Sequence, residues 1–349
     1  MTRPLVLAVL SVLLVSSVPS SADVFNLGPG LTNLDTVRMG NPRNAGELSG
    51  TGAGGYGPDR ICGSVGYIYY VGKFEVTAAQ YTNFLSKVAA TDTYGLYSAS
   101  MWSSPYGCKI QRSGSSGGYT YSVASNWANR PVNYVSYWDS VRFANWLHNG
   151  QPTGPQDLST TEDGAYYLNG YNGYDGRTIQ RNAGWKWAVT SEDEWYKAAY
   201  YAGRYWDYPT GSDTVPSNVG ADGYTDPGNH ANYRTGGMYT IGSPYYRTNV
   251  GEFENSPSVH GTFDQGGNVW EWNEAIVYQD ANYTYRGVRG GGYDSMDIHL
   301  QASYRNFYFT PNSESSGVGF RVSAVPEPSS LIALAGGFGM LLGLRRRRA

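Results

Sequence analysis

Cysteine and histidine are both scarce in this sequence of 349 residues, which contains two cysteines and four histidines. Neither the Cys-x-x-Cys nor the His-Glu-x-x-His spacing occurs, so the common sequence signatures of a zinc site are absent. The histidines show no paired spacing of the kind that predicts an iron site with two histidines and a carboxylate, although distant residues can converge. They are His148, His230, His260 and His299.

Positive charge is also limited, with 25 lysines and arginines against 28 aspartates and glutamates. Five of the basic residues lie in two terminal segments, residues 1–22 and 325–349. Without those segments the chain carries 20 basic and 27 acidic residues, a net charge of about −7. Since no basic cluster remains, we expect no nucleic-acid partner.

The first 22 residues have the pattern of a secretory signal peptide. Arg3 precedes an apolar run from Leu5 to Val18, and small residues follow as far as Ala22. We therefore predict that residues 1–22 direct export.

Export affects the interpretation of the two cysteines, Cys62 and Cys108, because exported proteins fold in an oxidising compartment. A single disulfide bond between them is the expected arrangement. Two free thiols are the alternative.

The last 25 residues resemble the PEP-CTERM sorting signal of bacterial envelope proteins. Pro326-Glu327-Pro328 precedes a mostly apolar stretch, Leu331–Leu344, and then four arginines. The apolar stretch is shorter than the roughly 20 residues that span a bilayer, so a sorting signal is favoured over a permanent anchor. The resemblance implies an exosortase partner, transient membrane association through the tail, and a final location at the cell surface, in the envelope or in the extracellular matrix.

Glycine and aromatic residues are abundant: the chain has 46 glycines, 32 tyrosines and 10 tryptophans. Glycine-rich stretches separate short aromatic runs, which favours a loop-rich fold with an aromatic core over a helical bundle. No repeat of fixed period and no sharp change in composition marks a linker, so we expect one domain.

Three segments predict helices through the same capping pattern. Thr77, Ser136 and Ser191 are each followed, three residues later, by a side chain that completes a capping box. Apolar residues then recur at helical spacing, which predicts one buried face for each helix. The expected helices cover residues 77–88, 136–148 and 191–202, and short strands and turns are expected after Gly203.

Five local patterns occur in one order along the chain. They are Gly72–Thr77 with Gln80-Tyr81, Pro131–Ser136, Ser191–Trp195, Gly267–Trp272, and Arg289–Gly291 with Gly319–Val322. Together they resemble the formylglycine-generating enzyme, or sulfatase-modifying factor, family over roughly residues 65–324. The resemblance implies one compact, loop-rich α+β domain related to the C-type lectin fold, preceded by a lead-in at residues 23–64.

Active members of this family oxidise a cysteine in a Cys-x-Pro-x-Arg sequence to formylglycine, using oxygen and a copper ion held by two cysteines. Here the corresponding interval, residues 290–319, contains no cysteine, and the positions nearest the pair are Ser295 and Leu300. Leucine cannot bind a metal, and serine is a poor ligand for copper(I). We therefore expect no copper site and name no catalytic residue.

Two functions remain open on these grounds. The first is an exported, surface-sorted binding or structural module that has lost the oxidase chemistry, with an extracellular polysaccharide or an envelope protein as its partner. Exposed aromatic side chains would suit stacking on sugar rings. The alternative is an active formylglycine-generating-like oxidoreductase, or a divergent metal-dependent oxidase, that modifies an exported protein.

The resemblance also implies structural calcium sites. The motif that contains Asn268, Val269 and Glu271 would supply two side chains and a backbone carbonyl, and Asn232-Tyr233 resembles a second, weaker site. Calcium favours six to eight oxygen ligands of this kind. The alternative is that Asn268 and Glu271 only satisfy buried backbone groups.

Three arginines near the C-terminal end, Arg289, Arg305 and Arg321, lie among glycine and aromatic residues. Their rigid donor groups would suit a polar pocket for an acidic or sugar ligand. The alternative interpretation is that they bridge carbonyl groups within the fold.

Overall fold

The computed structural model describes residue 25, residues 27–219 and residues 226–326. The segments predicted to direct export and sorting lie outside this range, apart from residues 325 and 326. In the range itself, no helix is both long and apolar enough to cross a membrane.

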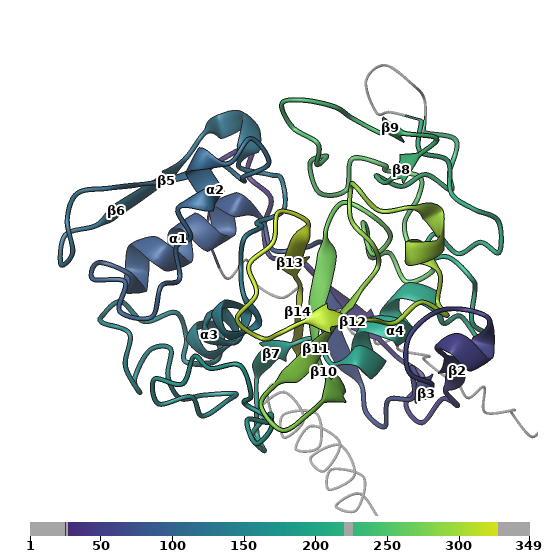
Figure 1. Ribbon diagram of the computed structural model, residues 1–349, viewed down its shortest axis with the longest axis horizontal. Coiled ribbons are helices and arrows are strands. Elements are labelled where there is room, and N and C mark those ends of the chain that lie inside the picture. The colour runs from purple at the N-terminus through teal and green to yellow at the C-terminus, as the bar shows by residue number, and fades with distance from the viewer. Residues whose placement is uncertain (1–24, 26, 220–225, 327–349) are drawn as a thin grey trace, which may run out of the picture.

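Two four-stranded sheets form the centre of the molecule (Figure 1). In the first sheet the strand order is β1-β4-β14-β7, and in the second it is β12-β11-β10-β13. All pairs are antiparallel except β10 with β13, where Trp270 lies opposite Val318. The strands are β1 Thr36–Met39, β4 Tyr69–Gly72, β7 Trp187–Val189, β10 Trp270–Gln279, β11 Thr284–Arg289, β12 Asn306–Phe309, β13 Val318–Phe320 and β14 Val322–Ala324.

Helices and two-stranded ribbons surround the sheets. Figure 1 shows α1, α2 and the β5–β6 ribbon on one side, and α4 with the β2–β3 ribbon on the other. The helices are α1 Ala78–Val88, α2 Ser100–Ser103, α3 Tyr137–His148 and α4 Glu192–Tyr200, with 3-10 turns η1 Thr51–Ala53, η2 Ser125–Trp127 and η3 Asp297–Leu300. The ribbons are β2 Glu47–Ser49 with β3 Arg60–Cys62, β5 Ile110–Ser113 with β6 Thr120–Val123, and β8 Arg234–Thr235 with β9 Met238–Tyr239.

The three predicted capping boxes are all present. The Thr77, Ser136 and Ser191 side chains each accept a hydrogen bond from the backbone amide three residues on, and the backbone amide of each donates to the side chain of that later residue. The third predicted helix, α4, is shorter than predicted. It ends at Tyr200, because Tyr201 is extended and pairs with Tyr205.

The main core is aromatic, as the composition predicts. Tyr81 and Phe84 of α1 pack against Phe143 and Trp146 of α3, and Phe320 of β13 completes the cluster. Ring centroids in this cluster are 5.2–6.5 Å apart, a separation at which aromatic pairs add to the energy of burial.

The expected disulfide bond is not formed: Cys62 and Cys108 are both free and buried. They lie in different clusters, Cys62 beside Trp195 and Tyr196, and Cys108 in the main core. The Cys62 thiol lies 3.4 Å from Arg289 Nη2, whereas the Cys108 thiol faces the Asn133 carbonyl at 4.0 Å. Burial, followed by the charge of Glu192, raises the pKa of Cys62 to about 11, so this thiol stays protonated and unreactive at neutral pH.

Candidate functional site

Ser295 and Leu300, the positions expected to lie nearest the family's cysteine pair, make structural contacts here. Ser295 closes a tight turn, because its Oγ accepts a hydrogen bond from the Gly292 amide at 2.9 Å. Leu300 is fully buried and packs in a cluster with Tyr208, Ala231 and Tyr233. The Leu300 side chain has no metal-binding atom, and the Ser295 hydroxyl is a poor ligand for copper(I).

Glycines bring this turn close to the strands. Gly290 has a φ of +94°, and a Cβ atom there would lie 2.5 Å from the Gln265 carbonyl oxygen. At Gly291 a Cβ atom would contact both the His299 and the Ser295 side chains, at 3.3 and 3.4 Å. The Arg-Gly-Gly motif therefore lets the chain double back so that Ser295 and His299 lie side by side.

An aromatic row extends from this turn to the surface. We use this name for Trp270, His299, Tyr304, Tyr56, Phe307 and Tyr308. Neighbouring rings in the row have centroids 4.6–5.6 Å apart, from buried Trp270 to Tyr308, whose exposed fraction is 60%. Two apolar side chains of the adjacent turn, Met296 and Ile298, are also exposed. The surface at this turn is thus aromatic and apolar.

His299 belongs to this row as a neutral ring. Its Nδ1 accepts a hydrogen bond from the Met296 amide at 3.0 Å, and burial lowers its pKa. No three side chains of histidine, cysteine, aspartate or glutamate gather into a metal-binding group within the described part of the chain.

The predicted polar pocket at Arg289, Arg305 and Arg321 is wrong for a physical reason: all three guanidinium groups are buried and paired. Arg289 and Arg305 both bind Glu192 of α4, with Nε distances to its Oε1 of 3.0 and 2.8 Å. The partly exposed Arg60 contacts the other oxygen of the same carboxylate at 2.8 Å. Arg289, Arg305 and Arg321 each also donate to backbone carbonyl groups, as the alternative interpretation expected.

The three arginines around Glu192 determine the protonation state of its carboxyl group. Burial alone would raise the pKa of its carboxyl group, but Arg289, Arg305 and Arg60 together hold that pKa well below its usual range. Arg289 also donates to the Ala302 and Tyr304 carbonyl groups, both at 2.9 Å. Arg289 therefore connects the segment from Ala302 to Tyr304, which carries one ring of the aromatic row, to Glu192 of helix α4.

Glu271 has a partner that conflicts with the calcium prediction. Arg321 contacts both of its carboxylate oxygens, at 2.5 and 2.6 Å, and the Trp195 indole N–H donates to Oε2 at 2.7 Å. Glu271 and Arg321 are both fully buried. A calcium ion would have to displace this ion pair to reach the carboxylate.

The structure brings the two asparagines of the predicted calcium sites together. Asn268 Oδ1 accepts a hydrogen bond from Asn232 Nδ2 at 3.0 Å and another from the Thr248 amide at 3.1 Å. The Tyr233 hydroxyl donates to the Pro216 carbonyl at 2.5 Å. Of these donor and acceptor groups, Asn232 Oδ1 alone lacks a partner among the described residues.

These residues do not fit a calcium ion, which needs six to eight oxygen ligands. The Glu271 carboxylate is bound by Arg321, and the Asn268 side-chain oxygen already accepts a hydrogen bond from the Thr248 amide. The alternative interpretation, that both residues satisfy buried backbone groups, holds for the bond from the Thr248 amide to Asn268, whereas Glu271 binds the side chains of Arg321 and Trp195.

This disagreement gives a direct prediction. We expect the melting temperature of the purified domain to change by less than about 1 °C between 5 mM EDTA and 5 mM calcium chloride, because the side chains expected to bind calcium are already engaged within the fold. Differential scanning calorimetry measures it. A rise of several degrees with calcium, and none with magnesium, would restore the calcium site.

Sequence reasoning missed Glu75, a buried acid next to this network. Its carboxylate accepts from Asn268 Nδ2 at 3.1 Å, and its pKa is raised well above the usual value by burial and then by the charges of Asp264 and Glu271. It lies in the motif Gly72–Thr77, two residues before the helix cap Thr77, but nothing local in the sequence indicates that it is buried.

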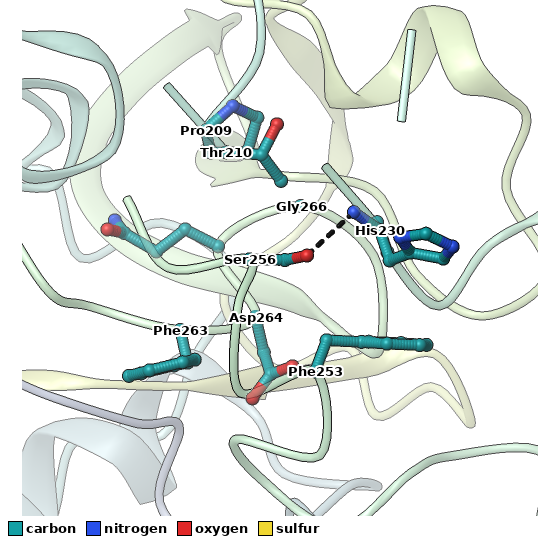
Figure 2. A pocket seen from close by; sticks show the side chains of 10 residues that line it. Pro209, Thr210, His230, Phe253, Ser256, Phe263, Asp264 and Gly266 are labelled. Atoms are coloured by element: carbon teal, nitrogen blue, oxygen red, sulfur yellow. Dashed lines mark hydrogen bonds between the residues drawn. The ribbon is translucent and has the colours of Figure 1, made fainter. Parts of the chain in front are cut away.

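Asp264 lies in a small pocket beside this acid (Figure 2). Burial raises its pKa to about 6, and its Oδ2 accepts from the Gly251 amide at 2.6 Å. Figure 2 shows Phe253 and Phe263 on the same side as Asp264, and the His230 amide donating to Ser256 Oγ at 2.8 Å. The cavity volume is only about 10 Å³, roughly the space of one water molecule, so the pocket cannot hold a peptide or a sugar.

Comparisons with known proteins agree with this architecture. Residues 65–325 match the family model of the sulfatase-modifying factor enzyme 1-like domain. No curated protein sequence matches the chain significantly.

Similar solved structures show the fold. The crystal structure of CarF is 19% identical with a TM-score of 0.53, covering 84% of this chain and 99% of CarF. Treponema denticola variable protein 1 is 16% identical with a TM-score of 0.51, and the match covers 86% of this chain and 98% of the Treponema protein chain. The fold is thus the α+β, loop-rich fold expected, and the chain belongs to the sulfatase-modifying factor enzyme 1-like (formylglycine-generating enzyme-like) family.

Proposed function

We propose that this protein is an exported member of its family that binds a ligand at the aromatic row and does not oxidise cysteine. The observation that carries the proposal is the state of the two cysteine positions. Ser295 closes a backbone turn and Leu300 fills a core, so the site lacks the thiolates on which the family's copper chemistry depends.

A glycan of the cell envelope or extracellular matrix is the proposed ligand. Sugar rings present apolar C–H faces that stack on aromatic side chains, and the aromatic row ends in exposed Tyr308 beside half-buried Tyr56 and Phe307. The Tyr56 and Tyr308 hydroxyls form a hydrogen bond with each other at the exposed end of the row, where they can also form hydrogen bonds with sugar hydroxyls. An envelope protein with an exposed apolar segment is the other ligand class to test.

The test of lost catalysis uses the purified mature domain. We expect mass spectrometry to find no formylglycine after incubation of a Cys-x-Pro-x-Arg peptide with the domain, oxygen and copper. Conversion of the peptide cysteine would favour the alternative function, an active oxidoreductase or divergent metal-dependent oxidase, for which the match to the family over residues 65–325 is the support.

The test of ligand binding compares two exposed tyrosines. We expect Tyr308→Ala to weaken binding to extracellular polysaccharide of the producing cells by about tenfold, because one stacked ring contributes roughly 0.5–1.5 kcal/mol beyond its area. Tyr278→Ala is the matched control, since Tyr278 is 51% exposed on β10 and lies outside the row. Equal loss in both variants, or in neither, would reject the aromatic row as the site, and binding can be measured by affinity electrophoresis.

The proposal includes a location at the cell surface. Its support is the sequence of the two ends: a signal peptide at residues 1–22 and a tail, residues 325–349, with the PEP-CTERM pattern. Exosortase is the proposed partner of that tail, and membrane association lasts until the tail is processed. The mass of the protein released from intact producing cells tests this, because a retained tail would contradict sorting by cleavage.

A further inference from the structure

The described chain ends at one end of the first sheet. The Val325 amide, just after β14, donates a hydrogen bond to the Lys186 carbonyl at 3.1 Å, next to the start of β7. One residue of each strand lies in a row across this end of the sheet, so that their side chains share one face: Arg38, Tyr70, Ala324 and Trp187. The surface around this point is called the exit rim here, and it consists of Arg38, Arg43, Tyr67, Tyr70, Trp185 and Trp187.

Four aromatic side chains of the exit rim reach the surface. Tyr67 is 43% exposed, and Tyr70, Trp185 and Trp187 are half-buried. The Tyr67 and Trp185 rings meet edge to face with their centroids 6.3 Å apart. Tyrosine and tryptophan have an apolar body and a polar tip, and for this reason they are enriched where a protein meets the boundary between a membrane and water.

Basic side chains accompany these rings, although the chain without its terminal segments is acidic. Arg38 and Arg43 are exposed, and neither forms an ion pair with another described residue. Lys186 is also exposed. The nearby acid Glu194 is fully buried and is neutralised by Arg181, with N–O distances of 2.8 and 2.9 Å. The exit rim therefore carries positive charge that no local stretch of sequence reveals, because it comes from distant segments.

The length of chain beyond the exit rim limits its distance from the predicted tail segment. The apolar stretch Leu331–Leu344 begins five residues after Pro326. Five extended residues span at most about 16–18 Å. The headgroup layer of a bilayer takes up roughly 5–8 Å of that distance. An apolar stretch inserted in a membrane would thus hold the exit rim at, or just above, the lipid headgroups.

We propose that the exit rim contacts an anionic membrane surface while the tail is in the bilayer. Tyr67 and Trp185 lie among the headgroups, and Arg38 and Arg43 bind lipid phosphates. The inference rests on the membrane association proposed above for the tail. It also assigns an orientation to the domain: Figure 1 shows the β8–β9 ribbon at the top of the view and β7 below the centre, so the ribbon points away from the membrane.

The first test measures the depth of a spin label in the exported chain with its tail, residues 23–349, bound to phosphatidylglycerol vesicles. Gly66→Cys places the label next to Tyr67, where an added Cβ atom meets nothing within 4 Å. Thr235→Cys, exposed on β8, is the matched control, and the native cysteines are buried. We expect the Gly66 label to be more accessible to oxygen than to a water-soluble nickel chelate, and the Thr235 label to show the reverse.

The second test measures vesicle binding of the same chain by sedimentation. Arg38→Gln with Arg43→Gln should weaken binding by about tenfold or more, because each basic residue near an anionic surface contributes about a factor of five. Lys87→Gln with Arg234→Gln is the matched control, since it changes the net charge equally at exposed positions on α1 and β8. Equal weakening by the two pairs would overturn the proposal.

The outcomes separate this inference from the proposed role of the tail. A chain that binds vesicles while both labels remain in water would overturn the contact at the exit rim and leave the tail association standing. A chain that does not bind vesicles would overturn both. Protection of the Gly66 label in cell membranes but not in pure lipid vesicles would identify a membrane protein as the partner and would also overturn the lipid contact.

Discussion

Replacing Glu192 with glutamine is expected to lower the free energy of unfolding by about 3–5 kcal/mol, because two buried arginines would lose their common counter-charge. Arg289 and Arg305 are 1% and 3% exposed, and no other carboxylate among the described residues pairs with them. Urea unfolding followed by tryptophan fluorescence measures the change. The free energy of unfolding of a domain is typically only about 5–15 kcal/mol, so the variant would lose a large part of its stability.

Asp193→Asn is the matched control for this prediction. Asp193 is adjacent in sequence, but its ion pair with Arg60 is partly exposed, so its loss should cost about 1 kcal/mol or less. Equal effects of the two substitutions would show that the buried cluster is not the source of the stability.

The same network determines how the protein responds to acid. The folded-state pKa of Glu192 lies below its ordinary value of 4.5, so its contribution is fully present above pH 4.5 and is lost as pH falls toward the folded pKa. We expect stability to fall on acidification below pH 4.5, and to fall less steeply in Glu192→Gln. Identical slopes in the two proteins would contradict this assignment.

Replacing Arg321 with methionine is expected to be about as costly, again about 3–5 kcal/mol, because it leaves the fully buried Glu271 with Trp195 as its remaining side-chain partner. Arg321 also donates to the Gly72 and Phe263 carbonyl groups, both at 2.9 Å, so several elements lose a shared contact. Urea unfolding of the purified variant measures the loss.

A second substitution separates the ion pair from the other contacts of Arg321. Glu271→Gln in the Arg321→Met background removes the unpaired charge, so we expect the double variant to be more stable than Arg321→Met alone. A double variant that is less stable than Arg321→Met would show that Glu271 does not act chiefly as the counter-charge of Arg321.

Short-range features were predictable because their partners lie close together in the chain. The capping boxes at Thr77, Ser136 and Ser191 each join residues three positions apart, and the geometry of a helix start allows only that pairing. The end of α4 was less predictable. Tyr201 pairs with Tyr205 in an extended conformation, although the alanines nearby favour continuing the helix.

Long-range partners were not predictable in the same way. Cys62 could be paired with Cys108 from the sequence, yet the fold places the two thiols in different clusters. Arg289, Arg305 and Arg321 were recognised as a group of donors, but only the fold shows that their acceptors are Glu192 and Glu271, 50–113 residues away.

The sequence by itself therefore determined the family, the loop-rich α+β fold, the starts of three helices, and the absence of cysteine from residues 290–319. Each of these depends on residue identity or on spacings of a few residues. The tertiary structure decided which carboxylate meets which arginine, and that Glu271 is held by Arg321. Those outcomes depend on how distant segments pack, because the environment of a buried charge is built from residues that the local sequence does not contain.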